Sequence, residues 1–294
     1  MRCDLHVHTV HSGMCTIPVV RRFCRESYST PEAVYETLKQ RGMDLVTVTD
    51  HDSLDAAAAL EGRPDFFPSV EVTCRMPSGT ELHVGVYGLN EGQYEEIRPR
   101  RDDLPSLAAY LAEQRLFFSA NHVFSVLTGR RTRADFDWIE RLFPALETLN
   151  AALPCASNRP AEALAIRTGK IAVGGSDAHT LPSLGLACTE VPGARSKAEF
   201  LDGLRQGRCR VRGEYGSYWK LTREVLLIIR EMMLEQPWTA LLSPLVTLVP
   251  PYMLGHHLAE TAFAHRWGWA LGRRGSRSPA DALPAGWTAR EERL

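Results

Sequence analysis

The run Asp4-Leu5-His6-Val7-His8-Thr9 places two histidines two residues apart in a stretch that otherwise has the composition of a β-strand. Because side chains on a strand alternate between its two faces, His6 and His8 should project together. Both imidazoles can then bind one metal ion, although an isolated HxH pattern is a weak indication of a metal site. The remaining sequence therefore has to supply further ligands if this pair belongs to such a site.

Further residues of the metal-binding types follow apolar runs along the chain. They are Asp50, His51, Glu71, His83, His122, Asp177 and His179. Together with the first pair, this set holds six of the ten histidines of the chain. Such recurrence predicts that these side chains converge on one site rather than lie scattered on the surface.

Residues 1–212 alternate between predicted strands and helices. Thr30 followed by Pro31 is typical of a helix start, with Thr30 as the N-cap and proline at the first helical position. Residues 45–49 are β-branched and apolar, which predicts a buried strand, and a later helix is expected over residues 160–168. The alternation predicts an α/β fold with parallel strands. Ligands at the ends of so many strands favour a closed barrel over an open sheet.

Composition and charge narrow the range of partners and compartments. The 294 residues carry a formal net charge of -1, so the chain has no overall attraction for nucleic acid or membrane. Its seven cysteines form no CxxC pair, which favours reduced thiols. Residues 1–9 read as the start of a strand, so we do not expect them to be a signal peptide. We therefore expect a cytoplasmic protein.

The composition changes near residue 213. Five of the six tryptophans lie beyond that point, and no charged residue occurs between Glu235 and Glu260. Because Pro244 and Pro250 interrupt this apolar segment, we expect a helical extension over residues 213–272 rather than a membrane span. The region 221–272 is predicted to be an interfacial hairpin at a membrane surface or a tail packed on the barrel or on another subunit. Residues 273–294 are predicted to form a flexible tail.

The ligand types suit a catalytic centre with more than one ion. Imidazole and carboxylate ligands without thiolate favour Zn²⁺, Mn²⁺ or Fe²⁺ over Mg²⁺. The eight candidate ligands exceed the four of a closed structural zinc site; they are His6, His8, His51, Glu71, His83, His122, Asp177 and His179. Two or three ions can share a bridging hydroxide and hold the oxygens of a phosphate ester during in-line attack.

Seven motifs, in this order, resemble the motif series of the PHP (polymerase and histidinol phosphatase) domain family. They are residues 4–9, 49–51, 70–72, 82–83, 121–122, 147–150 and 175–179. The match covers residues 1 to about 212. The resemblance implies a distorted seven-stranded β/α barrel, (β/α)7, that binds two or three metal ions.

The resemblance also implies a distribution of the ligands among the ions. The first ion is assigned to His6, His8, Glu71 and Asp177. Glu71 is expected to bridge to a second ion that His83 and His122 complete, and the third ion is assigned to His51 and His179. Many family members carry an aspartate after a serine that follows the HxHT motif, whereas here Gly13 follows Ser12. His11 and Cys15 are the candidates to replace that missing ligand.

The ligand set and the resemblance predict a metal-dependent phosphoesterase that acts on a small phosphate ester, a nucleotide or a short oligonucleotide. Glu71 and Asp177 are the predicted catalytic carboxylates, and Arg159 is the predicted phosphate-binding cation, because guanidinium binds phosphate oxygens bidentately. A long nucleic acid is not expected as a substrate, because its binding would favour a basic surface.

Two other classes of function remain open on the same residues. One is a metal-dependent hydrolase of the amidohydrolase type. The chain has only four lysines, and none follows a predicted strand in the ligand series, so a carbamylated lysine is not favoured. The other is a catalytically degenerate barrel that serves as a scaffold.

Overall fold

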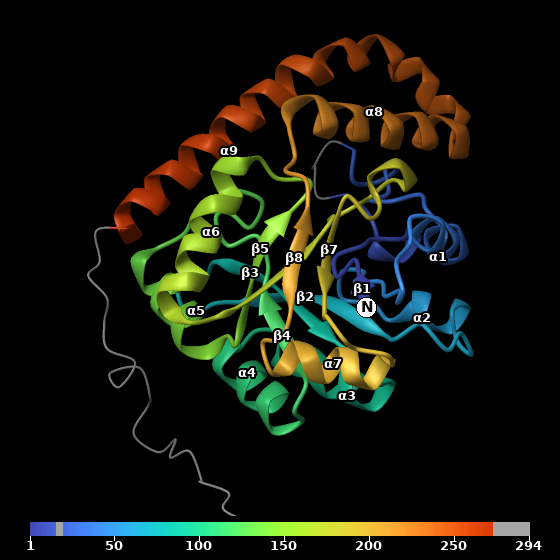
Figure 1. The fold of residues 1–294 in the computed structure, drawn as a ribbon. Coiled ribbons are helices and arrows are strands. Elements are labelled where there is room, and N and C mark those ends of the chain that lie inside the picture. Colours follow the sequence, from blue (N-terminus) through green and yellow to red (C-terminus); the bar gives the residue numbers. More distant parts are fainter. Residues whose placement is uncertain (16–19, 273–294) are drawn as a thin grey trace, which may run out of the picture.

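The computed structural model describes residues 1–15 and 20–272, which form a mixed α/β fold with helices around a central sheet and a helical C-terminal part (Figure 1). A five-stranded sheet has the order β2-β3-β4-β5-β6, and a three-stranded sheet has the order β1-β7-β8. The strands are β1 (Arg2–Cys3), β2 (Ser69–Arg75), β3 (Glu81–Tyr87), β4 (Phe117–Ala120), β5 (Ala145–Asn150), β6 (Ile171–Gly175), β7 (Ala187–Glu190) and β8 (Arg210–Gly213).

Helices connect and cover these strands. The α-helices are α1 (Pro31–Gln40), α2 (Asp55–Ala59), α3 (Glu91–Ile97), α4 (Leu104–Glu113), α5 (Arg133–Leu142), α6 (Cys155–Thr168), α7 (Lys197–Arg205), α8 (Tyr218–Glu235) and α9 (Val249–Gly272). The 3₁₀ helices are η1 (Val10–Ser12), η2 (Arg98–Arg100), η3 (Leu181–Ser183) and η4 (Pro237–Leu248). Thr30 caps α1 as expected, because its side chain accepts the backbone N–H of Ala33. Helix α6 begins at Cys155, ahead of the predicted residue 160.

The expectation of parallel strands throughout was wrong for the first part of the central sheet. Strands β4, β5 and β6 pair in parallel, whereas β2–β3 and β3–β4 pair antiparallel. The link between β2 and β3 explains the first reversal. It is a tight turn in which Met76 N–H donates to the Thr80 carbonyl over 2.8 Å. A parallel pair needs a crossover of a dozen or more residues, and this turn is far shorter.

The two runs that lead to His6, His8 and His51 were expected to be strands, but they form only isolated bridges, Val7 with Ala178, Val46 with Phe66 and His51 with Glu71. Side chains bind the backbone N–H groups that a ladder would otherwise pair. Val7 N–H donates to Thr49 Oγ1 over 2.9 Å, and Thr9 N–H donates to an oxygen of Asp50 over 2.6 Å. These segments are therefore held in an extended form by side-chain acceptors as well as by neighbouring strands.

A glycine sets the distance between two of these segments. A Cβ atom on Gly175, the last residue of β6, would lie 2.4 Å from the backbone nitrogen of His6. Only glycine therefore allows β6 to approach the His6 segment so closely. In the same place the backbone N–H of Asp177 donates to the His6 carbonyl over 2.8 Å.

The C-terminal helix α9 packs on the main hydrophobic core. Its residues Ala264, Trp267 and Leu271 are buried in the cluster that also holds side chains of the central sheet, α4, α5 and α6. The Trp267 ring lies 5.1 Å from the Phe136 ring, centroid to centroid. The chain passes from α8 through η4 into α9, and α9 then runs alongside α6 (Figure 1).

Within residues 1–15 and 20–272, no helix is long and apolar enough to cross a membrane. The uncharged stretch predicted to avoid spanning a bilayer is divided between η4 and the start of α9. The predicted flexible tail, residues 273–294, lies outside the described residues. Strand β8 ends at Gly213, and the division of the chain into domains near this residue stays a prediction.

A buried carboxylate on α9 holds this helix in place. Glu260 is 1 % exposed and accepts three hydrogen bonds from the other side of the contact. Ser157 Oγ on α6 donates over 2.8 Å, the Val126 N–H over 2.9 Å and the Ser125 hydroxyl over 3.1 Å. Ser125 and Val126 follow His122, so α9 also supports the loop that carries one of the predicted ligands.

Glu260→Ala should lower the free energy of unfolding by about 3 kcal/mol, because it leaves buried donors without an acceptor. Urea denaturation followed by circular dichroism measures this loss. Glu231→Ala, at a partly exposed position of α8, is the matched control and should change stability by less than about 0.5 kcal/mol. A Glu260 variant as stable as the control would contradict the anchoring role.

Candidate metal centre

The structure brings all eight predicted ligands together from six places in the chain. Five are buried, His6, His8, Glu71, His122 and Asp177, and three are partly exposed, His51, His83 and His179. Glu71 lies on β2 and His83 on β3, while the others follow β1, β4, β6 or the extended run before His51. The sequence prediction that these side chains converge is therefore confirmed.

Within the described part of the chain, four groups of three residues offer ligand atoms that lie within 4.8 Å of one another. The groups are His6, His122 and Asp177; His6, His8 and Glu71; His51, Glu71 and His83; and His8, His51 and His179. All eight predicted ligands occur in these groups. The shared members show that the groups are parts of one continuous cluster.

Glu71 lies at the middle of the cluster, with its two oxygens turned toward different histidines. Oε2 lies 3.1 Å from His6 Nε2 and 3.3 Å from His51 Nδ1. Oε1 lies 3.2 Å from His122 Nε2 and 3.6 Å from His83 Nδ1. One carboxylate is thus placed to serve two ions.

The distances in the cluster fit ligands that share an ion. Two atoms that are each about 2.1 Å from one ion lie roughly 3.0–3.4 Å apart at octahedral to tetrahedral angles. Asp177 Oδ1 lies 3.3 Å from His8 Nε2 and 3.4 Å from His6 Nε2, which agrees with that spacing.

Unpartnered atoms are concentrated at the same place. Of the seven buried side-chain nitrogen and oxygen atoms without a hydrogen bond among the described residues, six belong to the predicted ligands. They are His6 Nε2, His8 Nε2, His51 Nδ1, Glu71 Oε2, His83 Nδ1 and His122 Nδ1. Each such atom costs about 1–3 kcal/mol if it stays unpaired. Divalent ions would use these lone pairs, so the residues present fit a metal centre.

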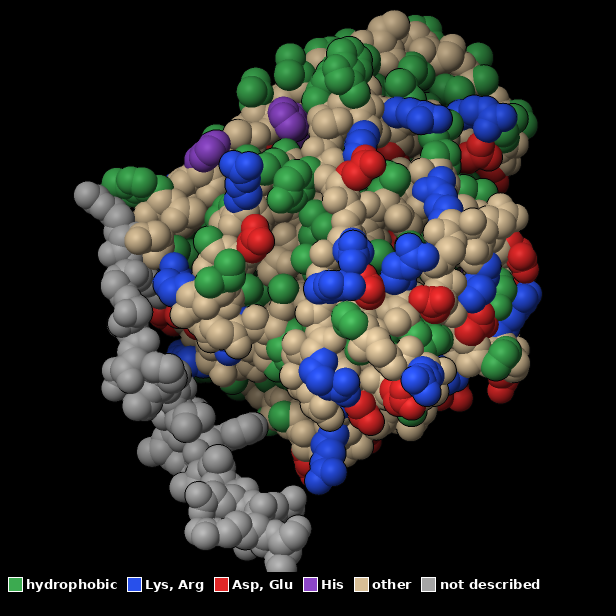
Figure 2. Space-filling view, viewed as in Figure 1, with side chains coloured by type: hydrophobic (Ala, Val, Ile, Leu, Met, Phe, Trp, Pro, Cys, Tyr) green, Lys and Arg blue, Asp and Glu red, His purple; other side chains and the backbone are tan. Residues whose placement is uncertain are grey.

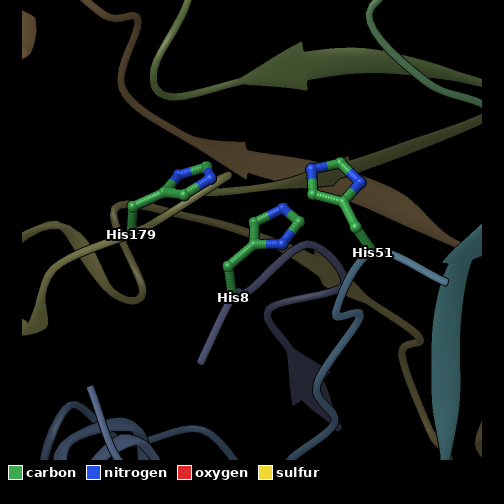
Figure 3. A group of neighbouring side chains, drawn as sticks. All are labelled: His8, His51 and His179. Atoms are coloured by element: carbon green, nitrogen blue, oxygen red, sulfur yellow. The ribbon is translucent and has the colours of Figure 1, made fainter. Parts of the chain in front are cut away.

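Three of the histidines lie as a row from three separate segments (Figure 3). The His8 ring lies between the other two, 4.3 Å from the His179 centroid and 4.7 Å from the His51 centroid. Figure 3 shows the nitrogen-bearing edges of the three rings facing a common space. The family resemblance assigns two members of this group, His51 and His179, to a third ion and His8 to the first.

Further carboxylates and amides orient the ligands. Glu147 accepts from His6 Nδ1 over 2.7 Å, which leaves the His6 Nε2 lone pair for the cluster. Asn121 Nδ2 donates to Glu71 over 2.8 Å, and Asn150 Nδ2 donates to Asp177 over 2.9 Å. These contacts hold both carboxylates in orientation.

Asp50, which directly precedes His51, belongs to the same supporting layer. It accepts from Ser12 Oγ over 2.7 Å, and Ser12 Oγ lies 2.9 Å from His8 Nδ1. Asp50 thus orients His8 through a serine, which is the role of a supporting carboxylate rather than of a ligand.

Two ligands adopt backbone conformations that cost energy. His122 has φ of 31° and Asp177 has φ of 52°, in the left-handed region that non-glycine residues rarely occupy. Such residues persist where the surroundings force them and cluster at functional sites. Here the strain turns both side chains toward the cluster at the ends of β4 and β6.

The charges in the cluster compensate one another. Burial by itself raises the pKa of Glu71, but His6, His83 and His51 lower it well below the ordinary value of a glutamate. Burial likewise raises the pKa of Asp177, and His6 and His8 reverse that effect. Burial lowers the pKa of His51 well below its usual range. Two ionised carboxylates and a neutral imidazole are the forms that bind metal.

Glu26 is a residue of this site that the sequence interpretation missed. Its carboxylate lies 3.6 Å from His51 Nε2 and 4.0 Å from His179 Nε2. Its backbone N–H donates to the carbonyl of Gly13 over 3.0 Å, so Glu26 lies directly across from the position where the family's aspartate is missing. The available signal was that Glu26 is the only acidic residue between Val10 and Ser29.

His11 and Cys15, the two candidates to replace that aspartate, differ in their position relative to the cluster. His11 belongs to none of the four ligand groups found among the described residues. Cys15 lines a cavity beside the cluster. Glu224 on α8 was also missed, and it accepts from the His179 N–H over 3.0 Å. The C-terminal extension therefore contributes a residue to the surroundings of the site.

The structure does not bring Arg159 to the cluster. It is exposed on α6 and does not line the cavity beside the cluster. Arg25, from the loop that also carries Glu26, lines that cavity and forms an ion pair with Glu235 over 2.9 Å.

The comparisons agree with the family resemblance. The family model described as PHP-associated matches residues 156–209. Together with the motif series, this match confirms the predicted resemblance of the chain to the PHP family. A search of curated proteins found no match to the sequence.

Solved structures show a related fold. PsfC from Pseudomonas syringae PB-5123 is 19% identical, covers 79% of this chain and 97% of its own, and has a TM-score of 0.54. The lesion-specific endonuclease PfuEndoQ from Pyrococcus furiosus is 16% identical, covers 70% of this chain and 56% of its own, and has a TM-score of 0.47. An amidohydrolase from Chromobacterium violaceum is 17% identical, covers 71% of this chain and 97% of its own, and has a TM-score of 0.44. The likeness to PsfC concerns the fold alone, and the other two scores are too low to add to it.

Removal of divalent ions should destabilise the folded chain, because ions that bind only the folded state stabilise it by mass action. Dialysis against a chelator should lower the Tm by several degrees in scanning calorimetry, and Zn²⁺ or Mn²⁺ should restore it. Asp177→Asn should abolish most of this metal-dependent shift. His265→Asn, at an exposed histidine outside the cluster, should keep it. Equal shifts in both variants would place the stabilising ions elsewhere.

Proposed function

We propose that this chain is a metal-dependent phosphoesterase that hydrolyses a phosphate ester of a small molecule, a nucleotide or a short oligonucleotide. The observation that carries the proposal is the set of six buried, unpartnered ligand atoms around Glu71. A structural cluster would align such atoms as hydrogen-bond donors and acceptors or replace them with apolar groups. Here His6 Nε2 and His51 Nδ1 lie 3.1 Å and 3.3 Å from Glu71 Oε2 without a hydrogen bond. Open lone pairs on buried imidazoles and a carboxylate instead indicate ion binding.

The donor types favour two or three ions of Zn²⁺, Mn²⁺ or Fe²⁺. Divalent ions at such a site supply a hydroxide nucleophile at neutral pH and positive charge for the phosphate oxygens. Glu71 is the bridging ligand in this proposal, because its two oxygens face different histidines. Asp177 completes the ligand set with His6 and His8.

The remaining residues of the chain position these ligands. Glu147 fixes the tautomer and ring orientation of His6. Asn121 holds Glu71. These contacts keep the ligands ready for an incoming ester without a rearrangement, which is how a preorganised site lowers a barrier.

We also infer that the strands close into a barrel. The five-stranded sheet has two edges, β2 and β6, and the segments around Val7 and Thr49 connect them. Ala178 O accepts from His8 N–H over 3.0 Å, and Val7 O accepts from Thr49 N–H over 2.8 Å. Asp50 O then accepts from Glu71 N–H on β2 over 3.2 Å. Neighbouring segments are thus hydrogen-bonded all the way from β6 back to β2.

Glu71→Ala should abolish hydrolysis and lower the bound metal by more than one ion per chain, because a bridging carboxylate serves two ions. Elemental analysis of protein purified without a chelator or histidine tag measures the metal. Release of phosphate from p-nitrophenyl phosphate and from nucleoside monophosphates measures turnover. Lost turnover with unchanged metal would contradict the bridging role.

The same experiment separates the proposed function from its alternatives. If the unaltered chain holds almost no metal after incubation with each ion, the catalytically degenerate scaffold is favoured. Bound metal with hydrolysis of amide or lactone substrates, but of no phosphate ester, would favour an amidohydrolase-type enzyme. Glu113→Ala, at an exposed position of α4, is the control and should behave as the unaltered chain.

Glu26→Ala should remove one ion from a preparation that binds three, because Glu26 is placed to complete the group of His51 and His179. Isothermal titration with Zn²⁺ or Mn²⁺ counts the sites independently of turnover. Replacement by aspartate should restore the third site less well than glutamate, since the shorter side chain falls short of both histidines. An unchanged ion count in Glu26→Ala would exclude this role.

A further inference from the structure

A cavity of about 660 Å³ opens beside the metal centre, between the loops of the central fold and the helical extension. Its volume lies within the range of about 300–1,000 Å³ that is usual for small-molecule sites. Four acidic or imidazole side chains of the cluster and its surroundings line the cavity, namely Glu26, Asp177, His179 and Glu224. The cavity is therefore continuous with the proposed catalytic site.

One face of α8 supplies a wall of the cavity, and this wall is apolar except for Glu224 beside His179. Leu221, Val225, Ile228 and Met232 follow one another at intervals of three or four residues and all line the cavity. This spacing places them on a single stripe of the helix. An apolar stripe usually packs into a core, but here it faces an open space next to a polar site.

The opposite wall comes from η4 and the start of α9. Leu242, Val246, Val249 and Met253 line it, so the uncharged segment of the sequence forms this side of the cavity. Methionines on both walls are unbranched and adapt to ligands of different shape. The two walls together present a long apolar surface that ends at the metal centre.

Polar contacts fix the extension against the metal centre. Glu224, one turn from Leu221 on α8, accepts from the backbone N–H of His179 over 3.0 Å and from Thr180 Oγ1 over 3.3 Å. On α9, Glu260 is held by Ser125 and Ser157. These contacts fix the position of the apolar walls relative to the candidate ligands.

The rim of the cavity is also apolar. Leu245, Leu248 and Tyr252 line the cavity and are 56 %, 60 % and 61 % exposed. In Figure 2, hydrophobic side chains gather over the end of the molecule formed by α8, η4 and α9. Apolar groups grouped in this way around an opening mark a place where an apolar ligand enters.

We propose that the substrate is an amphiphile: a phosphate ester whose alcohol part is a long apolar group that lies in the cavity of α8, η4 and α9 while the phosphate lies at the metal centre. This proposal rests on the proposed phosphoesterase function and names its substrate class. Hydrolysis adds water across the P–O bond, so that a proton and the alkoxide oxygen leave as the apolar alcohol and phosphate keeps the hydroxyl. A small polar ester would leave the apolar walls without a contact.

The test uses the full, metal-loaded chain and straight-chain alkyl phosphates with two, six and ten carbons, at concentrations below micelle formation. Burial of each methylene should improve binding by roughly three- to fourfold. From ethyl to hexyl phosphate, kcat/KM measured by phosphate release should therefore rise on the order of 100-fold. A flat or falling dependence on chain length, with hydrolysis of ethyl phosphate intact, would overturn the proposal and leave the phosphoesterase function in place.

A cavity variant and a matched control sharpen the test. Ile228→Glu should reduce the hexyl-to-ethyl ratio of kcat/KM at least tenfold, because it places a charge in the apolar wall. Leu234→Glu alters the same helix at a position that is 62 % exposed and does not line the cavity, and it should keep the ratio. Equal ratios in both variants would count against the cavity as the binding site.

A binding measurement keeps the proposal testable if no ester is hydrolysed. Titration calorimetry with hexyl and ethyl phosphate should still show tighter binding of the hexyl ester, lost in Ile228→Glu. That result would support the cavity as the binding site and would contradict the phosphoesterase function. If neither ester binds and sedimentation shows a dimer that Ile228→Glu dissociates, the cavity is a contact between two copies, and the proposal is wrong.

Discussion

The Glu71 carboxylate is the group around which this structure is arranged. It is completely buried, and histidines from four separate segments, His6, His51, His83 and His122, lie within 3.6 Å of its oxygens. A buried charge needs partners, because its desolvation costs far more than a neutral group's. The chain meets that need by bringing the ends of several strands to one point. This convergence is also what a multinuclear metal centre requires.

The layer around the ligands explains why the central fold departs from regular strands. Asp4, Thr49 and Asp50 accept backbone N–H groups of the histidine-bearing segments, in place of a strand ladder. Regular pairing would hold these backbones equally well, but it would leave fewer side chains to orient the imidazoles. The irregular bridges and the strained φ values of His122 and Asp177 therefore belong to the construction of the site.

The helical extension is tied to the same site from two sides. Glu224 on α8 binds the loop of His179, and Glu260 on α9 binds the loop after His122. Both glutamates are buried, so each carboxylate needs hydrogen-bond donors from the loop that it contacts. Glu224 also lines the apolar cavity together with other residues of α8, η4 and α9, so the extension borders the candidate site as well as covering the core. If the proposed phosphate ester binds there, specificity for its alcohol part depends on helices that lie outside the motif series.

The convergence of the eight candidate ligands, the α/β class and the family resemblance could be predicted from the sequence alone. Histidine and carboxylate after apolar runs are chemically distinctive, and residues two apart on an extended chain point to the same side. Thr30 and Pro31 likewise predicted the start of α1, because N-cap preferences depend on neighbouring residues only. Glu26 and Glu224 could not be assigned in this way, since each reaches the histidines only through contacts distant in sequence. The antiparallel β2–β3 pair depended on the length of a turn. The cavity was decided by tertiary structure, because an apolar stripe on α8 serves a core, a partner or a ligand equally well until packing leaves it facing an open space.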